Sequence, residues 1–345
     1  MTTAHLVLED GTVFAGRSVG APGVASGEAC FTTAMAGYEQ AASDPSYVGQ
    51  VLCFSYPLVG NYGVDPALLE CDGVQPRGIV MRRARPAWAR WLAEHDVIAL
   101  DDVDTRALVR RIREGGPIRC ALGTAAPEEL HARAQAEPPI DGRPLAESVG
   151  TLAPYAVGVG PRVVLLDLGC KRSIVERLAR SGLRVTVVPG SWTAEQVLAA
   201  RPRLVVVGNG PGDPAALDGA VETVRQLLGA VPVAGICLGH QLLGLALGLE
   251  TFKLPFGHRG ANHPVRDTAT GRVLVTSQNH GYALAAPDDL TTHVSLNDGT
   301  CEGIAGDGFF AVQFHPEAAP GPLDALPFFD RIAETCRSAQ TFKAS

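Results

Sequence analysis

From about residue 161 onward, short apolar segments typical of strands alternate with segments whose hydrophobic and polar positions are typical of amphipathic helices. The strands are apolar at successive positions, and this is typical of a parallel sheet covered by helices on both faces. After about residue 250 the pattern predicts mainly strands, followed by a last helix within 326–338. Three of the buried parallel strands are predicted at 162–168, 183–189 and 203–209.

Residues 1–150 lack this regular alternation. They open with a hairpin pattern at 5–20, where Asp10-Gly11 is a turn signal, and a helix is predicted at 104–116. The stretch at 152–161 is rich in Gly and Pro. We therefore expect an α/β protein with two domains. They are a mixed α/β N-terminal domain at 1–151 and a domain with a mostly parallel sheet flanked by helices at 161–340, joined by a linker at 152–160.

Composition and charge narrow the class of protein. The chain has 345 residues and a net charge of −7, which argues against a nucleic-acid or anionic-membrane partner. We find no charged leader followed by an apolar segment, and no stretch near the roughly 18 apolar residues that span a bilayer. The eight cysteines are scattered without a C-x-x-C pair. This spacing argues against a zinc ribbon or a disulfide framework and indicates a cytoplasmic protein.

The segment AGICLGHQ places Cys237 at a predicted sharp turn between a strand and a helix, with Gly235 and Gly239 on either side. This is the nucleophile-elbow pattern with cysteine in place of serine. The positive end of the following helix favours the thiolate, and backbone amides such as that of Leu238 can bind an oxyanion. The alternative for a lone G-x-C-x-G is a structural cysteine.

A thiolate acyl-transfer site also needs a base and a carboxylate that orients it. The segment AVQFHPEAAPG offers His315 and Glu317, two positions apart in a chain that the intervening Pro keeps extended. Taken alone, His-Pro-Glu is common in surface loops. After an elbow cysteine and a parallel sheet it becomes a candidate catalytic pair.

A glycine-rich turn, GNGPGDP at 208–214, follows a predicted strand at the carboxyl edge of the sheet. Ligands bind at this edge of such sheets, and Gly210 and Gly212 can bring bare amides close to a substrate oxygen. A phosphate-binding turn is the alternative, but the segment lacks a lysine.

Three histidines raise the question of a metal site. His258, His263 and His280 lie in loops rich in Gly and Asn, without nearby Asp or Cys ligands in the sequence. We therefore expect no metal and interpret these segments as shaping a substrate pocket. His240 is expected to pack or hydrogen-bond locally.

The cysteine elbow, the glycine-rich turn and the His-Pro-Glu segment, in their order along the chain, resemble the class I (triad) glutamine amidotransferase domain over roughly 161–340. The resemblance implies hydrolysis of the glutamine side-chain amide through a thioester on Cys237. It implies that His315 relays protons and that Glu317 orients it. The backbone amides of Gly210 and Leu238 would form the oxyanion hole.

Several segments are similar more specifically to the small subunit of carbamoyl phosphate synthetase. They include 253–265, 277–284 and 314–330, and in the N-terminal half 6–21, 27–50, 56–64 and 102–116, so the similarity spans nearly the whole chain. The implied glutamine contacts are Ser46, Gly210, Gly212, Leu238, Gln241, Asn279, Gly281 and Tyr282.

The resemblance also implies a division of labour between two subunits. This chain would release ammonia, and a large subunit would make carbamoyl phosphate from bicarbonate, ammonia and ATP for arginine and pyrimidine biosynthesis. The two would form a heterodimer that can assemble further, with the N-terminal domain docking on the partner. We expect no cofactor here, with ATP and Mg only on the partner. The absence of a G-x-x-x-x-G-K-[ST] loop supports this expectation.

Three other functions remain open at this point. An amidotransferase serving another synthase should lack the N-terminal 150 residues. A catalytically silent glutaminase-like module would bind or regulate a partner, and the intact Cys237, His315 and Glu317 argue against it. A simple cysteine hydrolase would be active without a partner and would need no docking domain.

Overall fold

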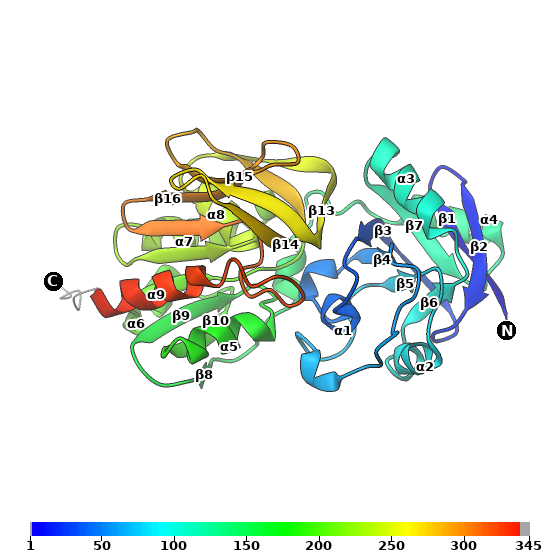
Figure 1. Cartoon of the computed structure of the whole chain (residues 1–345), viewed down its shortest axis with the longest axis horizontal. Coiled ribbons are helices and arrows are strands. Elements are labelled where there is room, and N and C mark those ends of the chain that lie inside the picture. Colours follow the sequence, from blue (N-terminus) through cyan, green and yellow to red (C-terminus); the bar gives the residue numbers. More distant parts are fainter. Residues whose placement is uncertain (1, 339–345) are drawn as a thin grey trace. The chain divides into compact units, whose positions relative to one another are not determined.

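The computed structural model describes residues 2–338 and divides the chain into two compact units, Met1–Asp141 and Gly142–Ser345 (Figure 1). This division precedes the boundary expected between residues 151 and 152. The segment expected to be a linker contains strand β8 (Tyr155–Val157), which pairs antiparallel with β10 (Arg184–Pro189). Backbone pairing therefore makes it part of the second unit. Residues 339–340 of the expected domain lie outside the described residues.

The first unit is built on a closed barrel, which the sequence pattern did not predict. The predicted hairpin is confirmed, because β1 and β2 pair antiparallel on either side of Gly11. The predicted helix at 104–116 is α3 (Thr105–Gly115), and the Asp104 carboxylate accepts a hydrogen bond from the Ala107 amide at its start. Around the barrel the strands follow the order β1 (Thr3–Leu8), β2 (Val13–Ser18), β6 (Ile98–Asp101), β5 (Gly78–Val80), β4 (Gln50–Phe54), β3 (Val24–Thr32) and β7 (Ile118–Gly123).

Helices and aromatic side chains pack around the barrel of the first unit. Tyr38, Phe54 and Trp88 are fully buried in one hydrophobic cluster, with the Tyr38 and Phe54 rings edge to face at 5.7 Å. Burying an aromatic side chain of this size contributes about 1.5–3 kcal/mol to stability. The remaining helices of this unit are α1 (Tyr38–Ala42), α2 (Pro86–Glu94), α4 (Pro127–Ala136) and the short 3-10 turns η1 (Pro45–Tyr47) and η2 (Pro66–Leu68).

The second unit contains a ten-stranded sheet, whose central strands β10, β9, β11, β12 and β17 run parallel. This confirms the α/β class and the parallel strands expected at the centre of the sheet, which continues into antiparallel strands at both ends. Its strand order is β14 (Val273–Ala285), β13 (Glu250–Asp267), β15 (Thr291–Ser295), β16 (Cys301–Gly306), β17 (Phe309–Val312), β12 (Val233–Ile236), β11 (Leu204–Val207), β9 (Arg162–Asp167), β10 and β8.

Helices cover both faces of this sheet, as the strand composition predicts. On β9, Val163 and Leu165 pack with helices α5 and α9, whereas Val164 and Leu166 pack with α6, α7 and α8. Alternate side chains of one strand thus enter two separate cores. The bounds are α5 (Arg172–Arg180), α6 (Ala194–Ala199), α7 (Asp218–Leu227), α8 (Leu238–Ala246) and α9 (Pro327–Ser338), with 3-10 turns η3 (Leu145–Ser148) and η4 (Pro214–Ala216).

The parallel arrangement brings four chain segments to one edge of the sheet. Because β9, β11, β12 and β17 point the same way, the residues that follow them meet at the same edge. Those residues are Lys171, Gly210, Cys237 and Gln313.

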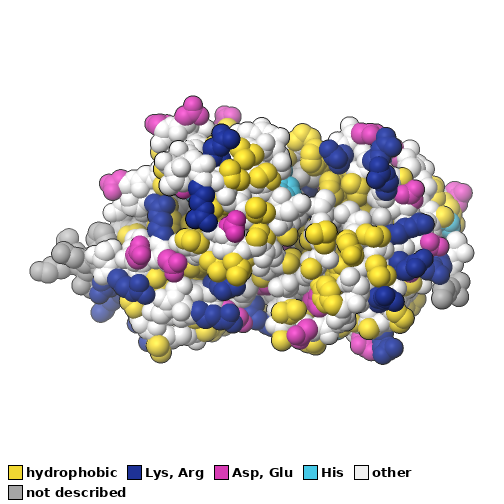
Figure 2. Space-filling model, in the orientation of Figure 1, with side chains coloured by type: hydrophobic (Ala, Val, Ile, Leu, Met, Phe, Trp, Pro, Cys, Tyr) yellow, Lys and Arg dark blue, Asp and Glu magenta, His cyan; other side chains and the backbone are white. Residues whose placement is uncertain are grey.

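No helix in the described part of the chain has the length and apolar character needed to cross a bilayer. Basic and acidic side chains are interspersed over the face seen in Figure 2, so the net charge of −7 is not concentrated in one patch there.

Candidate active site

Cys237 lies at the corner between β12 and α8 in a backbone conformation that few residues adopt. Its φ is 55° and its ψ is −104°, and its amide donates to Val312 O at 2.9 Å. A non-glycine residue in such a region costs about 1–3 kcal/mol and persists only where its surroundings enforce it. The strained corner predicted from the sequence is therefore present.

The two flanking glycines are required by close backbone contacts. A Cβ on Gly235 would lie 2.6 Å from Gly239 O, and a Cβ on Gly239 would lie 2.1 Å from Val207 O. Both distances are too short for any side chain. The expected reason for glycine on each side of the corner is confirmed, because the turn brings helix α8 directly onto the strands.

His315 and Glu317 form a buried pair in the same unit as Cys237. His315 Nδ1 lies 2.7 Å from Glu317 Oε1, and the two residues are 2% and 0% exposed. The His315 amide donates to Ser277 O at 2.8 Å, which ties this segment to β14. The two side chains therefore adopt the arrangement in which a carboxylate orients an imidazole.

Lys171 completes this group and was not found from the sequence. Its Nζ lies 2.7 Å from Glu317 Oε1 and also donates to Ala319 O. The Lys171 side chain is 3% exposed, so the ion pair is shielded from water. The only signal in the sequence is its position, since it follows the carboxyl end of a buried parallel strand.

The pKa values of Glu317 and His315 are changed by the charged side chains beside them. Burial alone would raise the pKa of Glu317, yet Lys171 and His315 hold that pKa well below its usual range. Burial also opposes a charge on His315, but Glu317 and Cys237 outweigh it and raise the pKa of His315 to about 10. The imidazole is therefore held as its cation beside the cysteine.

The Cys237 sulfur is buried among polar groups. Its Sγ lies 3.7 Å from the backbone oxygen of Asn279 and 3.7 Å from Nε2 of Gln313. His315 Nε2 has no well-aligned hydrogen-bond partner among the described residues, although Cys237 is close enough to influence the His315 pKa. Gln313 is a second contact that sequence reasoning missed, although it lies two positions before His315 on an extended segment.

The glycine-rich turn packs against the start of helix α8. A Cβ on Gly210 would lie 2.1 Å from Leu168 O and 2.9 Å from Cδ2 of Leu238, so only glycine fits there. Gly212 has a φ of 96° and lies against Arg143 and Leu145. The structure thus places Gly210 beside Leu238, the two residues expected to supply oxyanion-binding amides.

Four of the other predicted glutamine contacts also gather in this unit. Asn279, Gly281 and Tyr282 lie on β14, and Gln241 on α8 donates from Nε2 to Tyr282 O at 2.8 Å. Ser46 belongs to the first unit, where its amide donates to Asp44 Oδ1 at 2.9 Å, and it stays a predicted contact.

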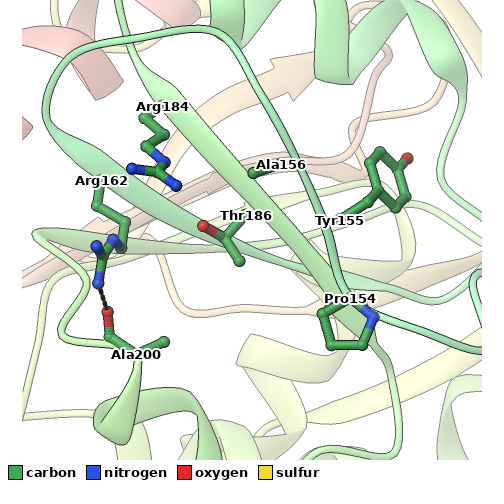
Figure 3. A pocket seen from close by; sticks show the side chains of 7 residues that line it. All are labelled: Pro154, Tyr155, Ala156, Arg162, Arg184, Thr186 and Ala200. Atoms are coloured by element: carbon green, nitrogen blue, oxygen red, sulfur yellow. Dashed lines mark hydrogen bonds between the residues drawn. The ribbon is translucent and has the colours of Figure 1, made fainter.

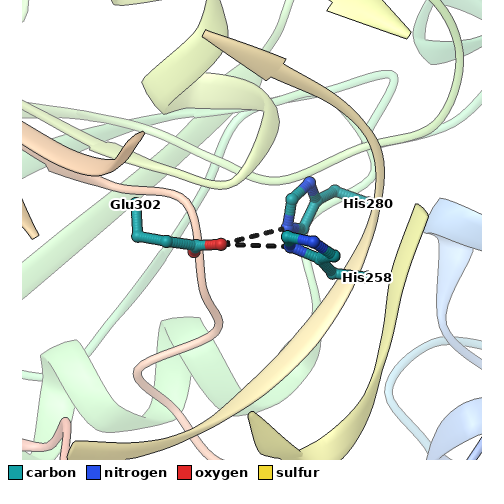
Figure 4. A group of neighbouring side chains, drawn as sticks. All are labelled: His258, His280 and Glu302. Atoms are coloured by element: carbon teal, nitrogen blue, oxygen red, sulfur yellow. Dashed lines mark hydrogen bonds and ion pairs between the residues drawn. The ribbon is translucent and has the colours of Figure 1, made fainter. Parts of the chain in front are cut away.

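A second polar cluster corrects one sequence argument (Figure 4). His258 and His280 were expected to lack acidic neighbours, but folding brings both beside Glu302, and Asp298 also contacts His258. His258 Nδ1 lies 3.1 Å from Glu302 Oε1, and His258 Nε2 lies 2.8 Å from Asp298 Oδ2. The acidic partners come from strand β16 and the loop before it, so local sequence could not reveal them.

This cluster has the donor types that a divalent metal takes, since one ligand atom from each of His258, His280 and Glu302 lies within 4.8 Å of the others. The groups already hold one another, however. His258 Nδ1 lies 3.1 Å from Glu302 Oε1, and His280 Nε2 lies 3.0 Å from Gln278 Oε1. A cation would have to replace these hydrogen bonds.

A shallow pocket lies elsewhere in the unit, at the edge formed by β8 and β10 (Figure 3). Arg162, one of its lining residues, donates to Ala200 O. None of the residues that line this pocket belongs to the predicted site. The lining residues are Pro154, Tyr155, Ala156, Arg162, Arg184, Thr186 and Ala200.

Comparison with known proteins identifies both halves of the chain. The family model described as glutamine amidotransferase class-I matches residues 164–335. The model described as carbamoyl-phosphate synthase small chain, CPSase domain, matches residues 6–122. Both matches agree with the resemblance drawn from the sequence motifs.

Two curated relatives cover nearly the whole chain. The carbamoyl phosphate synthase small chain of Thermus thermophilus is 46% identical over 96% of this chain and 92% of its own length. The carbamoyl phosphate synthase small chain of Methanopyrus kandleri is 45% identical over 97% of this chain and 99% of its own length. The chain belongs to the family of carbamoyl phosphate synthase small chains, in which a small-chain domain precedes a class I glutamine amidotransferase domain.

Proposed function

We propose that this chain hydrolyses the side-chain amide of glutamine at Cys237 and passes the ammonia to the large subunit of carbamoyl phosphate synthase. The main support is a thiol at a strained corner, buried beside an imidazole–carboxylate pair that a lysine holds in its charged form. Family membership supports the same reaction.

In the proposed reaction Cys237 attacks as its thiolate, with the His315 cation beside it. The Cys237 sulfur attacks the side-chain carbonyl carbon of glutamine, and the backbone amides of Gly210 and Leu238 bind the resulting oxyanion. His315 then donates its proton to the departing nitrogen, the C–N bond breaks, and ammonia leaves a thioester. Glu317 keeps the imidazole oriented and Lys171 keeps Glu317 ionised.

The second half of the reaction uses neutral His315 as a base. It takes a proton from water while the water oxygen attacks the thioester carbon. The C–S bond breaks, the thiolate of Cys237 returns beside the His315 cation, and the new carboxylic acid loses its proton to water as glutamate is released. One water is consumed for each ammonia and glutamate formed, so the site needs no cofactor for this step.

Glutamine is held, in this proposal, by directional polar groups around the corner. Both amide hydrogens of Gln241 are engaged by the protein, and its Oε1 is the atom that can accept from the substrate. The full set of proposed contacts is Ser46, Gly210, Gly212, Leu238, Gln241, Asn279, Gly281 and Tyr282.

The remaining steps belong to the partner in this proposal. The large subunit binds ATP and Mg, activates bicarbonate, and forms a heterodimer with this chain through the N-terminal unit. We place the complex in the cytoplasm, because all eight cysteines are free, which suits a reducing compartment.

The test is glutamine hydrolysis by the full chain, alone and with its large subunit, for wild type and Cys237→Ala. We expect weak activity alone, a large increase with the partner, and loss of activity in the variant. Cys71→Ala, in the first unit, is the matched control and should keep wild-type activity. If Cys237→Ala hydrolysed glutamine as well as wild type, the proposed nucleophile would be wrong. If wild type were inactive with the partner, a silent regulatory module would replace the proposal.

A further inference from the structure

The side chain of Gln313 contacts the Cys237 sulfur at the point where β17 ends. Gln313 is 0% exposed, and its Nε2 lies 3.7 Å from Cys237 Sγ. Its position is fixed by the backbone, since the Gln313 amide donates to Glu302 O at 2.9 Å. A buried amide group is therefore held against the reacting atom.

Hydrogen bonds on its far side determine which end of this amide faces the sulfur. A backbone oxygen only accepts, so Gln241 must turn its NH₂ group toward Tyr282 O, at 2.8 Å. The same nitrogen lies 3.1 Å from Oε1 of Gln313 and donates its second hydrogen there. The oxygen of Gln313 thus faces α8, and its NH₂ group faces the sulfur.

His240 supplies a second donor to the same oxygen. Its Nδ1 lies 3.2 Å from Gln313 Oε1, which accepts only if the proton is on Nδ1. Burial lowers the pKa of His240 to about 4, so the ring is neutral and carries one proton. Two donors from α8 therefore hold the amide in one orientation.

The two polar groups beside Cys237 Sγ, the Gln313 NH₂ group and the Asn279 backbone oxygen, favour opposite protonation states of the sulfur. The thiol hydrogen can be donated to Asn279 O, which favours the neutral thiol. An N–H donated to sulfur instead stabilises the thiolate, because hydrogen bonds to an ionised group are stronger than those to its neutral form. The Gln313 NH₂ group favours the form that attacks a carbonyl.

We infer that Gln313 is a further residue of the reaction machinery, whose side-chain NH₂ group orients Cys237 Sγ and stabilises its thiolate, while Gln241 and His240 fix the orientation of that amide. This inference rests on the proposed function, because it takes Cys237 as the nucleophile. It assigns Gln241 a role beyond substrate binding, as one of the two donors that orient the amide.

The test measures the thiolate directly, without glutamine. Full-length wild type, Gln313→Met and Gln313→Glu are treated with iodoacetamide across a pH series, and alkylation of the Cys237 peptide is followed by mass spectrometry. Cys71 in each sample is the internal reference thiol. We expect the Gln313→Met profile to move to higher pH, with alkylation near neutral pH slowed about three- to tenfold. Gln313→Glu should be slower still, because its carboxylate repels a thiolate.

The outcomes separate this inference from the proposed function. Reactive wild-type Cys237 with unchanged profiles in both Gln313 variants would overturn the inference and leave the nucleophile intact. Wild-type Cys237 no more reactive than Cys71, together with no glutaminase activity, would remove the proposed function itself. Should Gln313→Met fail to fold, Gln241→Met tests the same geometry, since a freed amide should also slow alkylation of Cys237. An unchanged profile there would count against the inference.

Discussion

Two regions of the second unit each place histidine against a buried glutamate. The first is centred on Glu317 and the second on Glu302, and the pKa values of these two carboxyl groups are shifted in opposite directions. The pKa of Glu317 is held well below its usual range, whereas burial raises the pKa of Glu302. Both side chains are 0% exposed. Burial alone therefore does not decide the charge of either group.

The difference lies in the partners. Glu317 has the Lys171 ammonium at 2.7 Å in addition to His315, and this permanent cation compensates for the lost hydration. Glu302 is paired with His258 and with the neutral amide of Gln278. The ordinary pKa is about 6.5 for histidine and about 10.4 for lysine, so burial removes the charge of histidine more readily, and histidine stabilises a buried carboxylate less. The region around Glu317 suits catalysis, whereas the region around Glu302 links strands β13, β14 and β16.

The largest expected effect is the loss of activity when Glu317 is neutralised, compared with neutralising Glu302. Glu317→Gln should lower kcat/KM for glutamine by about 10³- to 10⁴-fold in the complex with the large subunit, because the imidazole loses the charge that keeps it protonated and oriented. Glu302→Gln, the matched control, should stay within about tenfold of wild type. Equal losses in the two variants would show that the two carboxylates do not differ in function.

Removing the lysine should make the first region resemble the second. Lys171→Met leaves Glu317 buried without its ammonium partner, and breaking such a pair costs about 3–5 kcal/mol of stability. Glutamine hydrolysis should fall with it, because the pKa of Glu317 rises and His315 loses its proton. Urea unfolding and kcat/KM measure the two effects, with Arg172→Met as the neighbouring charge control. A Lys171→Met protein with wild-type stability and activity would contradict the ion-pair account.

The smallest effect is a pH dependence that differs between the two regions. The folded-state pKa of His315 is raised to about 10, so its stabilising contribution is complete below about pH 6.5 and is lost as pH rises toward 10. The pKa of His280 is lowered by burial, so its unfolded form binds more protons and stability falls as pH drops below about 6.5.

Urea unfolding across the pH range separates these two contributions. His315→Asn should flatten the alkaline decline in the free energy of unfolding, and His280→Asn should flatten the acid decline. If each variant changed the other limb instead, the assignment of charge to the two regions would be reversed.

Much of the site was predictable because its parts are short motifs. The corner around Cys237 needs only a strand, two glycines and a helix start, and all of these are local in sequence. His315 and Glu317 are two positions apart, so their pairing follows from an extended chain. The parallel sheet was predicted from strands that are apolar on both faces.

The remaining site residues depend on distant pairings. Lys171 and Glu317 are separated by 146 positions, and His258 and Glu302 by 44. The argument that the histidines lack acidic neighbours was wrong for this reason, since it considered only adjacent sequence. The closed barrel of the first unit was missed because closure depends on how strands far apart in the chain pair, for example β1 with β7.

By itself the sequence determined the elements, the strained cysteine corner and the histidine–glutamate pair, since period, glycine spacing and extended geometry act between near neighbours. Only the tertiary structure decided the charges of His315 and Glu317 and which end of the Gln313 amide meets the sulfur. Both depend on burial and on partners brought from distant segments, such as Lys171 and Gln241. A pKa shift or an amide orientation is a property of the assembled surroundings, and no local pattern contains it.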